Sequence, residues 1–454
     1  MGNANKSADS LFEKANVLFG EKKYEEAVAV FRDAADAGSV DALYMMGICY
    51  NYNMGVNEPD ESRRGVTASE YFIRAAELGH ADAQCFAGLC MLHGIGVERD
   101  VNGAVEWFEK SAEQGSVQAM NNLGYIYENG ICSENGKGDY AKAYEWYKKS
   151  ADREDPTGRL GVGKAYYYGR GVGRDYKEAV KWYSLAAGQG LADALFRLGE
   201  CYDDGDGVDS DEDIAFGLYM QAAQKNHAKA QCYVGYCYEN GCGVDCDMDE
   251  AIKWYNVSAQ NDYFQAYCNL GCLYERGDGV KKNMATAIEM YEKGAELGSV
   301  MAVYNLGNVY AFGKGVKVDN KRAVEYYIRA AENGMAEAQY NLAQHLHKGL
   351  GTDRDDEAAA FWFEQAAKQG DSDAQCKIAL FYLEGVGVDE DPETAVAWFE
   401  RSAEQGDADA QYCLGSCYAD GVGVEKDIAK AKKWYTAAAE NGRADAKKAL
   451  KKLD

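Results

Sequence analysis

The chain has 454 residues, and its 74 acidic residues outnumber its 48 basic residues by 26, which gives a formal net charge of −26. A surface with this charge repels nucleic-acid backbones and anionic membrane faces, so neither is expected as a partner. No apolar stretch approaches the ~18 residues that a membrane span requires, and the first residues lack the apolar core of a signal peptide. We therefore expect a cytoplasmic protein that does not insert into a membrane.

Residues 1–40 are predicted to form one helix pair joined by a short turn. Ala15, Leu18, Ala27, Phe31 and Ala34 fall at the spacing of apolar residues on two short helices.

From residue 41 to residue 443, small residues recur every 36 positions. Alanine holds eight evenly spaced positions, and Gly158 has the same phase one period before them. The eight are Ala194, Ala230, Ala266, Ala302, Ala338, Ala374, Ala410 and Ala446. Ala42, Ala83 and Ala119 continue the series upstream at slightly longer spacings. Such a period is typical of a solenoid, whose units stack because none can bury its apolar face alone. We therefore predict one extended all-α array of about eleven repeats.

Each repeat is predicted to contain two antiparallel helices. In the repeat at Ala194, Leu198 continues the first helix, and the glycines of the turn 205–208 end it in a left-handed conformation. Asp211 is expected to cap the second helix. Gly199, inside the first helix, costs about 1 kcal/mol in helix propensity. Its recurrence in other repeats indicates that a neighbouring backbone packs too closely for a side chain.

The second helix carries an aromatic pair, and all seven tryptophans hold its first place. They are Trp107, Trp146, Trp182, Trp254, Trp362, Trp398 and Trp434. Because the pair recurs in one phase, we interpret it as core, with Trp254 as a large buried aromatic, and not as a cofactor site. Residues 444–454 are rich in lysine and are predicted to form a helix that caps the last apolar face.

These residues resemble the Sel-one-like repeat (SLR) family, a tetratricopeptide-like class. The resemblance runs from about Ala42 to Gly442, because the small residue, the Gly-x-Gly turn, the capping aspartate and the aromatic pair recur in phase. Residues 1–40 look more like an ordinary tetratricopeptide unit. The resemblance implies a right-handed α-solenoid, or superhelix, of antiparallel helix pairs, with the first helices lining a concave groove.

No motif composes an active site, a cofactor site or a metal site. Gly158 to Lys164 imitates a phosphate loop, but Ala165 stands where serine or threonine must hold magnesium. Cys242 and Cys246 lack a paired CxxC motif or a histidine partner. We therefore expect no cofactor and no metal.

Groove positions, transferred through the resemblance, lie two, three, six and nine residues after each recurring alanine. The predicted partner-binding residues at these positions are Tyr233, Tyr236, Glu239, Asn269, Glu275, Tyr304, Asn305, Asn308, Tyr340 and Asn341. Tyrosine offers contact area with a hydroxyl, and asparagine can pair with an extended backbone. The carboxylates favour a basic segment.

We therefore predict a non-catalytic scaffold or adaptor that binds a protein or peptide, with an extended or basic segment in the groove. One alternative is a hydrolase of the β-lactamase type, which is attributed to cysteine-rich relatives of the family. The chain lacks the S-x-x-K motif, and alanines (Ala187, Ala223, Ala259) stand where those relatives have disulfide cysteines. Another alternative is a regulatory module that serves a separate enzyme. The identity of the partner and the oligomeric state stay open.

Overall fold

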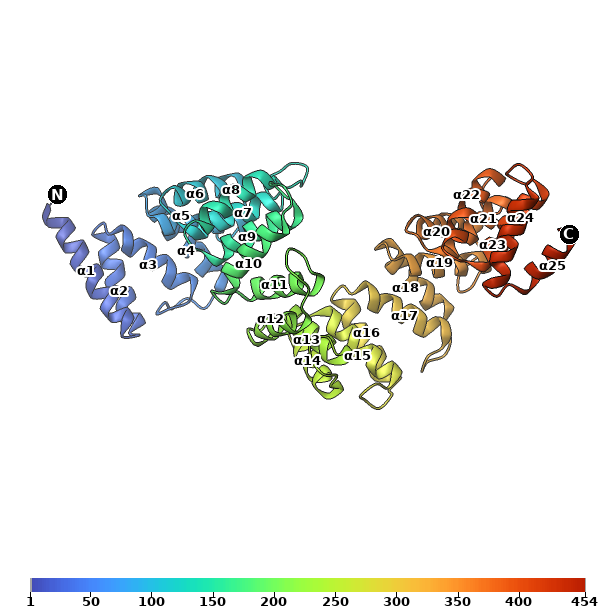
Figure 1. Ribbon diagram of the computed structural model, residues 1–454. Helices are drawn as coiled ribbons and strands as arrows, with labels where there is room; N and C mark the ends of the chain where they lie inside the picture. Colours follow the sequence, from blue (N-terminus) through green and yellow to red (C-terminus); the bar gives the residue numbers. More distant parts are fainter. Residues whose placement is uncertain (1, 454) are drawn as a thin grey trace. The chain divides into compact units, whose positions relative to one another are not determined.

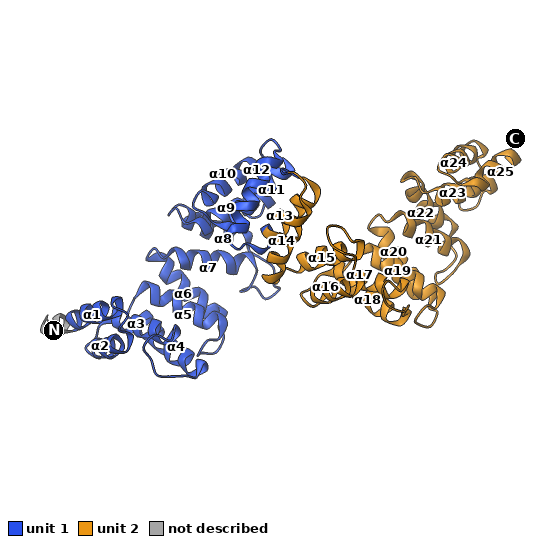
Figure 2. Ribbon diagram, turned by 90° about the horizontal axis from the view of Figure 1, so that it is seen from below, with its two compact units in different colours: residues 1–230, 242–244 blue, residues 231–241, 245–454 orange. Residues whose placement is uncertain are grey.

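Figure 1 shows a computed structural model that describes residues 2–453, with side chains from residue 8 onward. These residues form 25 α-helices and no strand, which confirms the predicted all-α class. They fall into two compact units, residues 1–230 with 242–244 and residues 231–241 with 245–454 (Figure 2). None of the helices described is long and apolar enough to cross a membrane.

Helices follow one another in pairs along the chain. The first unit contains α1 (Gly2–Gly20), α2 (Tyr24–Asp36), α3 (Val40–Asn51), α4 (Glu61–Glu77), α5 (Ala81–His93), α6 (Val101–Glu113), α7 (Val117–Glu128), α8 (Tyr140–Ala151), α9 (Pro156–Tyr168), α10 (Tyr176–Ala187), α11 (Ala192–Asp204) and α12 (Glu212–Gln224). Helix α13 (Ala228–Asn240) begins in the first unit and ends in the second. The second unit continues with α14 (Met248–Gln260), α15 (Phe264–Arg276), α16 (Met284–Glu296), α17 (Val300–Phe312), α18 (Asn320–Glu332), α19 (Ala336–Lys348), α20 (Asp356–Lys368), α21 (Ser372–Glu384), α22 (Pro392–Glu404), α23 (Ala408–Asp420), α24 (Ile428–Glu440) and α25 (Ala444–Leu453).

Within each unit, a helix packs mainly against the helices directly before and after it, as in a solenoid. The odd-numbered helices from α3 to α23 are the first helices of the repeats, and the even-numbered helices that follow them are the second helices. Neighbouring first helices also touch, as α15 and α17 do. A row of first helices therefore forms a continuous surface within a unit.

Local polar bonds start and end these helices as the sequence predicts. Asp211 accepts a hydrogen bond from the backbone N–H of Ile214 at 2.9 Å and begins α12. Gly205 ends α11 with a φ of 75°, a left-handed conformation that glycine adopts without strain. The capping aspartate and the left-handed glycine recur along the array, because each depends only on residues within a few positions of the helix end.

The glycine inside the first helix faces an aromatic ring. A Cβ atom added to Gly199 would lie 2.6 Å from Cε1 of Tyr219, whereas the nearest backbone atom, the carbonyl oxygen of Ala215, would lie 3.3 Å away. The same relationship joins Gly235 to Tyr255 at 2.8 Å. The prediction of a tight contact is correct, but the nearest group is the ring of the second helix, and the backbone of that helix is the second, more distant contact.

The aromatic pair is divided between the core and its edge. Tyr255 is fully buried, whereas Trp254 is only partly buried, so the prediction of Trp254 as a large buried aromatic is wrong. Neighbouring residues on a helix point about 100° apart, and only the second member of the pair faces the first helix. Six of the seven tryptophans are partly buried and lie at the edge of the core, whereas Trp398 is buried. Trp362, for example, packs against two clusters of buried residues, one within residues 268–342 and one within residues 343–446.

Candidate functional site

The predicted partner-binding residues lie on four first helices of the second unit. Helix α13 carries Tyr233, Tyr236 and Glu239, α15 carries Asn269 and Glu275, α17 carries Tyr304, Asn305 and Asn308, and α19 carries Tyr340 and Asn341. We refer to these ten residues as the groove row. Tyr236 is 51% exposed, and the other nine are partly buried. The row is thus accessible, but most of its side chains also contact the rest of the chain.

Side-chain amides connect each first helix to the one before it. Asn269 Nδ2 donates to Cys232 Sγ at 3.6 Å, and Asn305 Nδ2 donates to Cys268 Sγ at 3.7 Å. In the next step Asn341 Nδ2 donates to the hydroxyl oxygen of Tyr304 at 3.3 Å. The asparagines three residues after the recurring alanines therefore join the four helices into one polar surface.

The two glutamates of the groove row are bonded inside the chain. Glu239 accepts a hydrogen bond from the buried hydroxyl of Tyr255 at 2.7 Å and pairs with Arg276 at 2.9 Å. Glu275 accepts one from Tyr291 at 2.8 Å. Burial, followed by the neighbouring carboxylate, raises the pKa of Tyr255 well above its usual range, so this tyrosine stays a neutral donor.

Cations of the following repeats form ion pairs with both carboxylates. Arg276 lies 37 residues after Glu239, and Lys314 lies 39 residues after Glu275, at 2.6 Å from its Oε1 atom. Sequence reasoning missed these two cations. A basic residue one period and a few positions after each acid is the signal that could have revealed them. The groove row is therefore less negative than its glutamates alone indicate.

Several groove residues also support the core. Asn308 Oδ1 accepts the hydroxyl proton of the buried Tyr327 at 2.8 Å, and the ring of Tyr304 lies 6.1 Å from that of Tyr327. Tyr340 contacts Phe363 edge to face, with ring centroids 5.6 Å apart. Substitution of these residues would disturb packing as well as any partner contact. Tyr236 is the most exposed aromatic of the groove row, so its substitution should disturb the packing least.

A cavity of about 370 Å³ adjoins the end of the row between α19, α20 and α21. Tyr340 lines it together with Phe363 and Phe381, and Lys348, Lys377 and Glu384 stand among the charged lining residues. The sequence did not predict this cavity, because its walls come from three helices of two repeats.

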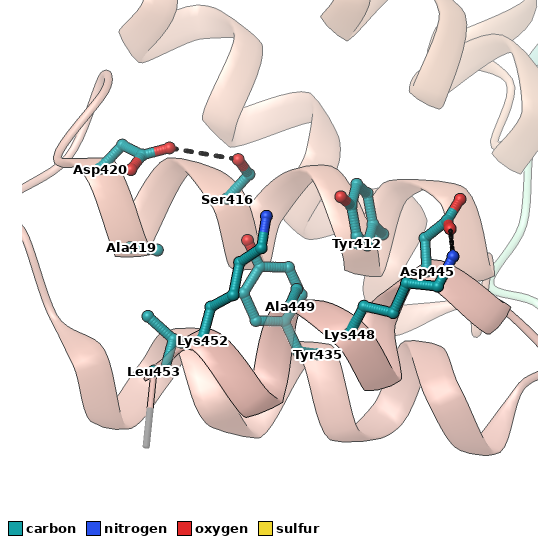
Figure 3. A pocket seen from close by; sticks show the side chains of 10 residues that line it. All are labelled: Tyr412, Ser416, Ala419, Asp420, Tyr435, Asp445, Lys448, Ala449, Lys452 and Leu453. Atoms are coloured by element: carbon teal, nitrogen blue, oxygen red, sulfur yellow. Dashed lines mark hydrogen bonds and ion pairs between the residues drawn. The ribbon is translucent and has the colours of Figure 1, made fainter.

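A second cavity, of about 420 Å³, lies beside the C-terminal helix α25 (Figure 3). Tyr412 and Ser416 of α23 line one side, and Lys448 and Lys452 of α25 line the other. The charged groups are partly paired, since Lys448 Nζ lies 3.7 Å from Asp445 Oδ1. The lysines predicted for a capping helix thus border a hollow of moderate size.

Residues 2–453 also contain the segments that imitate a metal site and a phosphate loop in the sequence. Within this range, no group of three or more His, Cys, Asp or Glu side chains could hold a metal ion. The segment from Gly158 to Lys164 that imitates a phosphate loop lies inside helix α9, and the Gly158 N–H donates to the capping carboxylate of Asp155. Gly161 and Gly163 make room for the rings of Tyr147 and Tyr183, whereas Gly158 packs against Ser150 and the backbone of Ala151.

Comparisons with known proteins agree with this architecture. A family model described as Sel1 repeat matches eleven segments: residues 40–80, 81–116, 117–155, 158–191, 192–227, 228–263, 264–299, 300–335, 336–371, 372–407 and 408–442. A solved structure of a protective antigen from uropathogenic Escherichia coli, which displays an SLR fold, is 32% identical. The match covers 94% of this chain and 90% of that one, with a TM-score of 0.59. A Sel1 repeat protein from Oxalobacter formigenes is 30% identical over 68% of this chain and 90% of that one, with a TM-score of 0.52.

Curated relatives match over shorter stretches. The ERAD-associated E3 ubiquitin-protein ligase component HRD3B of Arabidopsis thaliana is 36% identical over 77 residues, which are 17% of this chain and 11% of that protein. The chitin synthase regulator SKT5 of Saccharomyces cerevisiae is 29% identical over 143 residues, or 31% and 19% of the two chains. The matched part is less than a fifth of either relative.

Proposed function

Because the chain belongs to the Sel1 repeat family, we propose that it is a non-catalytic scaffold whose protein partner lies along the groove row of α13, α15, α17 and α19. The observation that carries this proposal is the continuity of the row. Asparagines join successive first helices, so tyrosine and amide groups follow one another along the surface at the spacing of the repeats.

The chemistry of the row favours an extended segment. An extended chain rises about 3.3 Å per residue and presents N–H and C=O groups along its length, which amides and hydroxyls can bind. Tyr236 provides an exposed aromatic surface for a side chain of the partner. A lysine or arginine of the partner would have to displace Arg276 or Lys314 to reach Glu239 or Glu275. We therefore propose a segment rich in amides, with basic residues where it would replace Arg276 and Lys314 as the partners of Glu239 and Glu275.

The names of the curated relatives support action through other proteins. HRD3B is named as a component of a ligase and SKT5 as a regulator of a synthase. Since the matches cover 11% and 19% of these proteins, the ligase and synthase connections are not transferred to this chain.

A comparison of two exposed aromatics tests the proposal. Tyr236 on a first helix is 51% exposed, and Phe361 on the second helix α20 is 52% exposed. Full-length protein, Tyr236→Ala and Phe361→Ala are used as baits against lysate, and the bound proteins are identified by mass spectrometry. The proposal expects at least one partner that Phe361→Ala retains and Tyr236→Ala loses. Partners that respond only to Phe361→Ala, or equally to both variants, would overturn the assignment to the groove row.

A further inference from the structure

Two cysteines lie one helical turn apart on α15, the first helix that carries Asn269 and Glu275 of the groove row. Cys268 is buried, and Cys272 is partly buried at the position six residues after Ala266, which is equivalent to Tyr236 and Asn308 in their repeats. Residues four apart on a helix share a face, so the two sulfur atoms are neighbours. Cys272 is not one of the ten residues of the groove row.

Hydrogen-bond donors converge on this thiol pair. Asn305 Nδ2 lies 3.7 Å from Cys268 Sγ and 3.8 Å from Cys272 Sγ, so its two N–H groups can serve one sulfur each. The hydroxyl oxygen of Tyr291 lies 3.5 Å from Cys272 Sγ and 2.8 Å from Glu275 Oε2. The single hydroxyl proton of Tyr291 goes to the nearer Glu275 carboxylate, so the amide of Asn305 on α17 is the donor that reaches both sulfur atoms on α15. A thiolate accepts such bonds better than a thiol does.

The charges around Cys272 come from α15, α13 and the turn after α17. Arg276 lies one turn beyond Cys272 and favours a negative sulfur, while Glu275 opposes it. Glu275 is itself paired with Lys314, and Arg276 is shared between Glu239 and Asp278. The bond donated by Cys268 lowers the pKa of Cys272 most, Arg276 adds to the effect, and burial works against it. The pKa of Cys268 is raised correspondingly.

Other cysteines of the array show that neither a second cysteine four residues away nor an amide donor is enough to lower the pKa of a thiol. Cys413 and Cys417 have the same spacing on α23, but burial raises the pKa of each to about 11. Cys232 accepts a bond from Asn269, as Cys268 does from Asn305, yet burial raises its pKa to about 12. On α15, Cys272 combines a second thiol one turn away with an amide that reaches both sulfur atoms, and Arg276 lies one turn further along the helix.

We propose that Cys272 is a reactive thiolate and the site at which peroxide modifies this protein, with Cys268 as the donor that stabilises it. The sulfur attacks one oxygen of hydrogen peroxide, so an S–O bond forms and the O–O bond breaks. Cys272 becomes a sulfenic acid, hydroxide leaves, and the sulfur loses the two electrons that the peroxide gains. The hydroxide is neutralised by a proton from the acid form of the buffer, which gives water.

The geometry favours the sulfenic acid over a disulfide as the product that accumulates. Cβ atoms four residues apart on a helix are about 5–6 Å apart, whereas a disulfide requires about 3.5–4.5 Å. Attack by Cys268, with loss of water, would therefore need α15 to distort. Oxidation of Cys272 places a polar S–OH group on the groove surface between Asn269 and Asn305.

Pulse labelling tests the reactivity without any substitution. The reduced full-length protein is treated briefly with iodoacetamide at pH 6.5, and each cysteine is quantified by tandem mass spectrometry. At this pH a thiol with the ordinary pKa of about 8.5 is only about 1% ionised. We expect Cys272 to react at least about tenfold faster than Cys413, which corresponds to one pKa unit or more. We also expect it to react ahead of the more exposed Cys246. Labelling that follows exposure, with Cys246 first and Cys272 no faster than Cys413, would overturn the proposal.

Peroxide followed by dimedone tests the product. The adduct is expected on Cys272, and Cys272→Ser should remove it, whereas Cys417→Ser should not. Cys268→Ala removes the stabilising donor and is expected to slow the labelling of Cys272 about tenfold, whereas Cys232→Ala should leave it unchanged. Adducts that form on Cys413 as readily as on Cys272, or labelling of Cys272 that folded Cys268→Ala does not slow, would contradict the proposal. The wild-type labelling order decides the matter if Cys268→Ala does not fold by circular dichroism.

Discussion

The hydroxyl of Tyr255, a fully buried residue of α14, donates a hydrogen bond to Glu239 Oε2 on α13 at 2.7 Å. The bond joins the core of a repeat to its groove surface, because the ring packs against Gly235 while the oxygen reaches the carboxylate. Tyr291 and Glu275 repeat it one unit later, at 2.8 Å. A change in the groove carboxylates is therefore also a change in core bonding.

Tyr255→Phe should destabilise the protein by about 1.5–3 kcal/mol, the usual contribution of a hydrogen bond to a charged group. Tyr183→Phe is the matched control, because the Tyr183 hydroxyl is buried and has no partner. This second change should leave the free energy of unfolding unchanged or raise it. Urea unfolding followed by circular dichroism measures both. Equal losses in the two variants would show that the bond to Glu239 contributes nothing.

Gly199→Ala should destabilise the array by about 1–3 kcal/mol, because the new methyl group would lie 2.6 Å from the ring of Tyr219. Gly217→Ala, in the middle of α12, meets no atom within 4 Å and should stabilise the helix by up to about 1 kcal/mol. Thermal unfolding should move the two midpoints in opposite directions. Two stabilised variants would mean that the ring moves aside at little cost.

Protonation of His345 should weaken the fold below about pH 6.5. Burial lowers the pKa of His345 below its ordinary value, and its Nδ1 atom lies 2.8 Å from the carbonyl oxygen of Asn341. At pH values between the pKa of His345 in the folded protein and its pKa in the unfolded protein, the unfolded chain binds more protons than the folded chain. The contribution of His345 is therefore complete above the unfolded pKa and is lost as the pH falls through the folded one. His345→Gln should reduce the loss of unfolding free energy between pH 7.5 and pH 5. If the wild type and the variant lose the same unfolding free energy, His345 does not contribute to the pH dependence.

Arg276→Gln should strengthen the binding of a basic partner segment to the groove row. The substitution frees Glu239 from its ion pair at 2.9 Å, so a lysine or arginine of the partner no longer competes for it. Isothermal titration should show a higher affinity that falls as salt is added. Unchanged affinity at low salt would mean that no basic residue of the partner reaches Glu239. The loops near Pro59 and Cys132 would then be the next surfaces to substitute.

Nitrocefin hydrolysis separates the scaffold from the alternative of a β-lactamase-type hydrolase. We expect no turnover that scales with the concentration of the purified chain, since the sequence has no S-x-x-K motif. Turnover proportional to protein through successive purification steps would replace the scaffold proposal with an enzymatic one.

The sequence by itself determined the repeat, the helix ends and the fold class. The period of 36 residues, the cap at Asp211 and the left-handed turn at Gly205 are all visible in the sequence, because each depends on residues close together in one repeat. The tight contact at Gly199 was also predicted, but its partner was not, since Tyr219 lies 20 positions away on another helix.

Only the tertiary structure decided which side chains are buried and which charges are paired. The rotation of each second helix about its axis turns Tyr255 inward and leaves Trp254 at the edge, although both are large aromatics in one periodic pair. The stacking of one repeat on the next brings Arg276 to Glu239, Lys314 to Glu275, and Asn305 to Cys268 and Cys272. These contacts cross between helices 33–39 residues apart, and their geometry follows from how the helices pack and not from the residues that separate them. The groove row stays a prediction from the repeat phase, and its electrostatics follow from that packing.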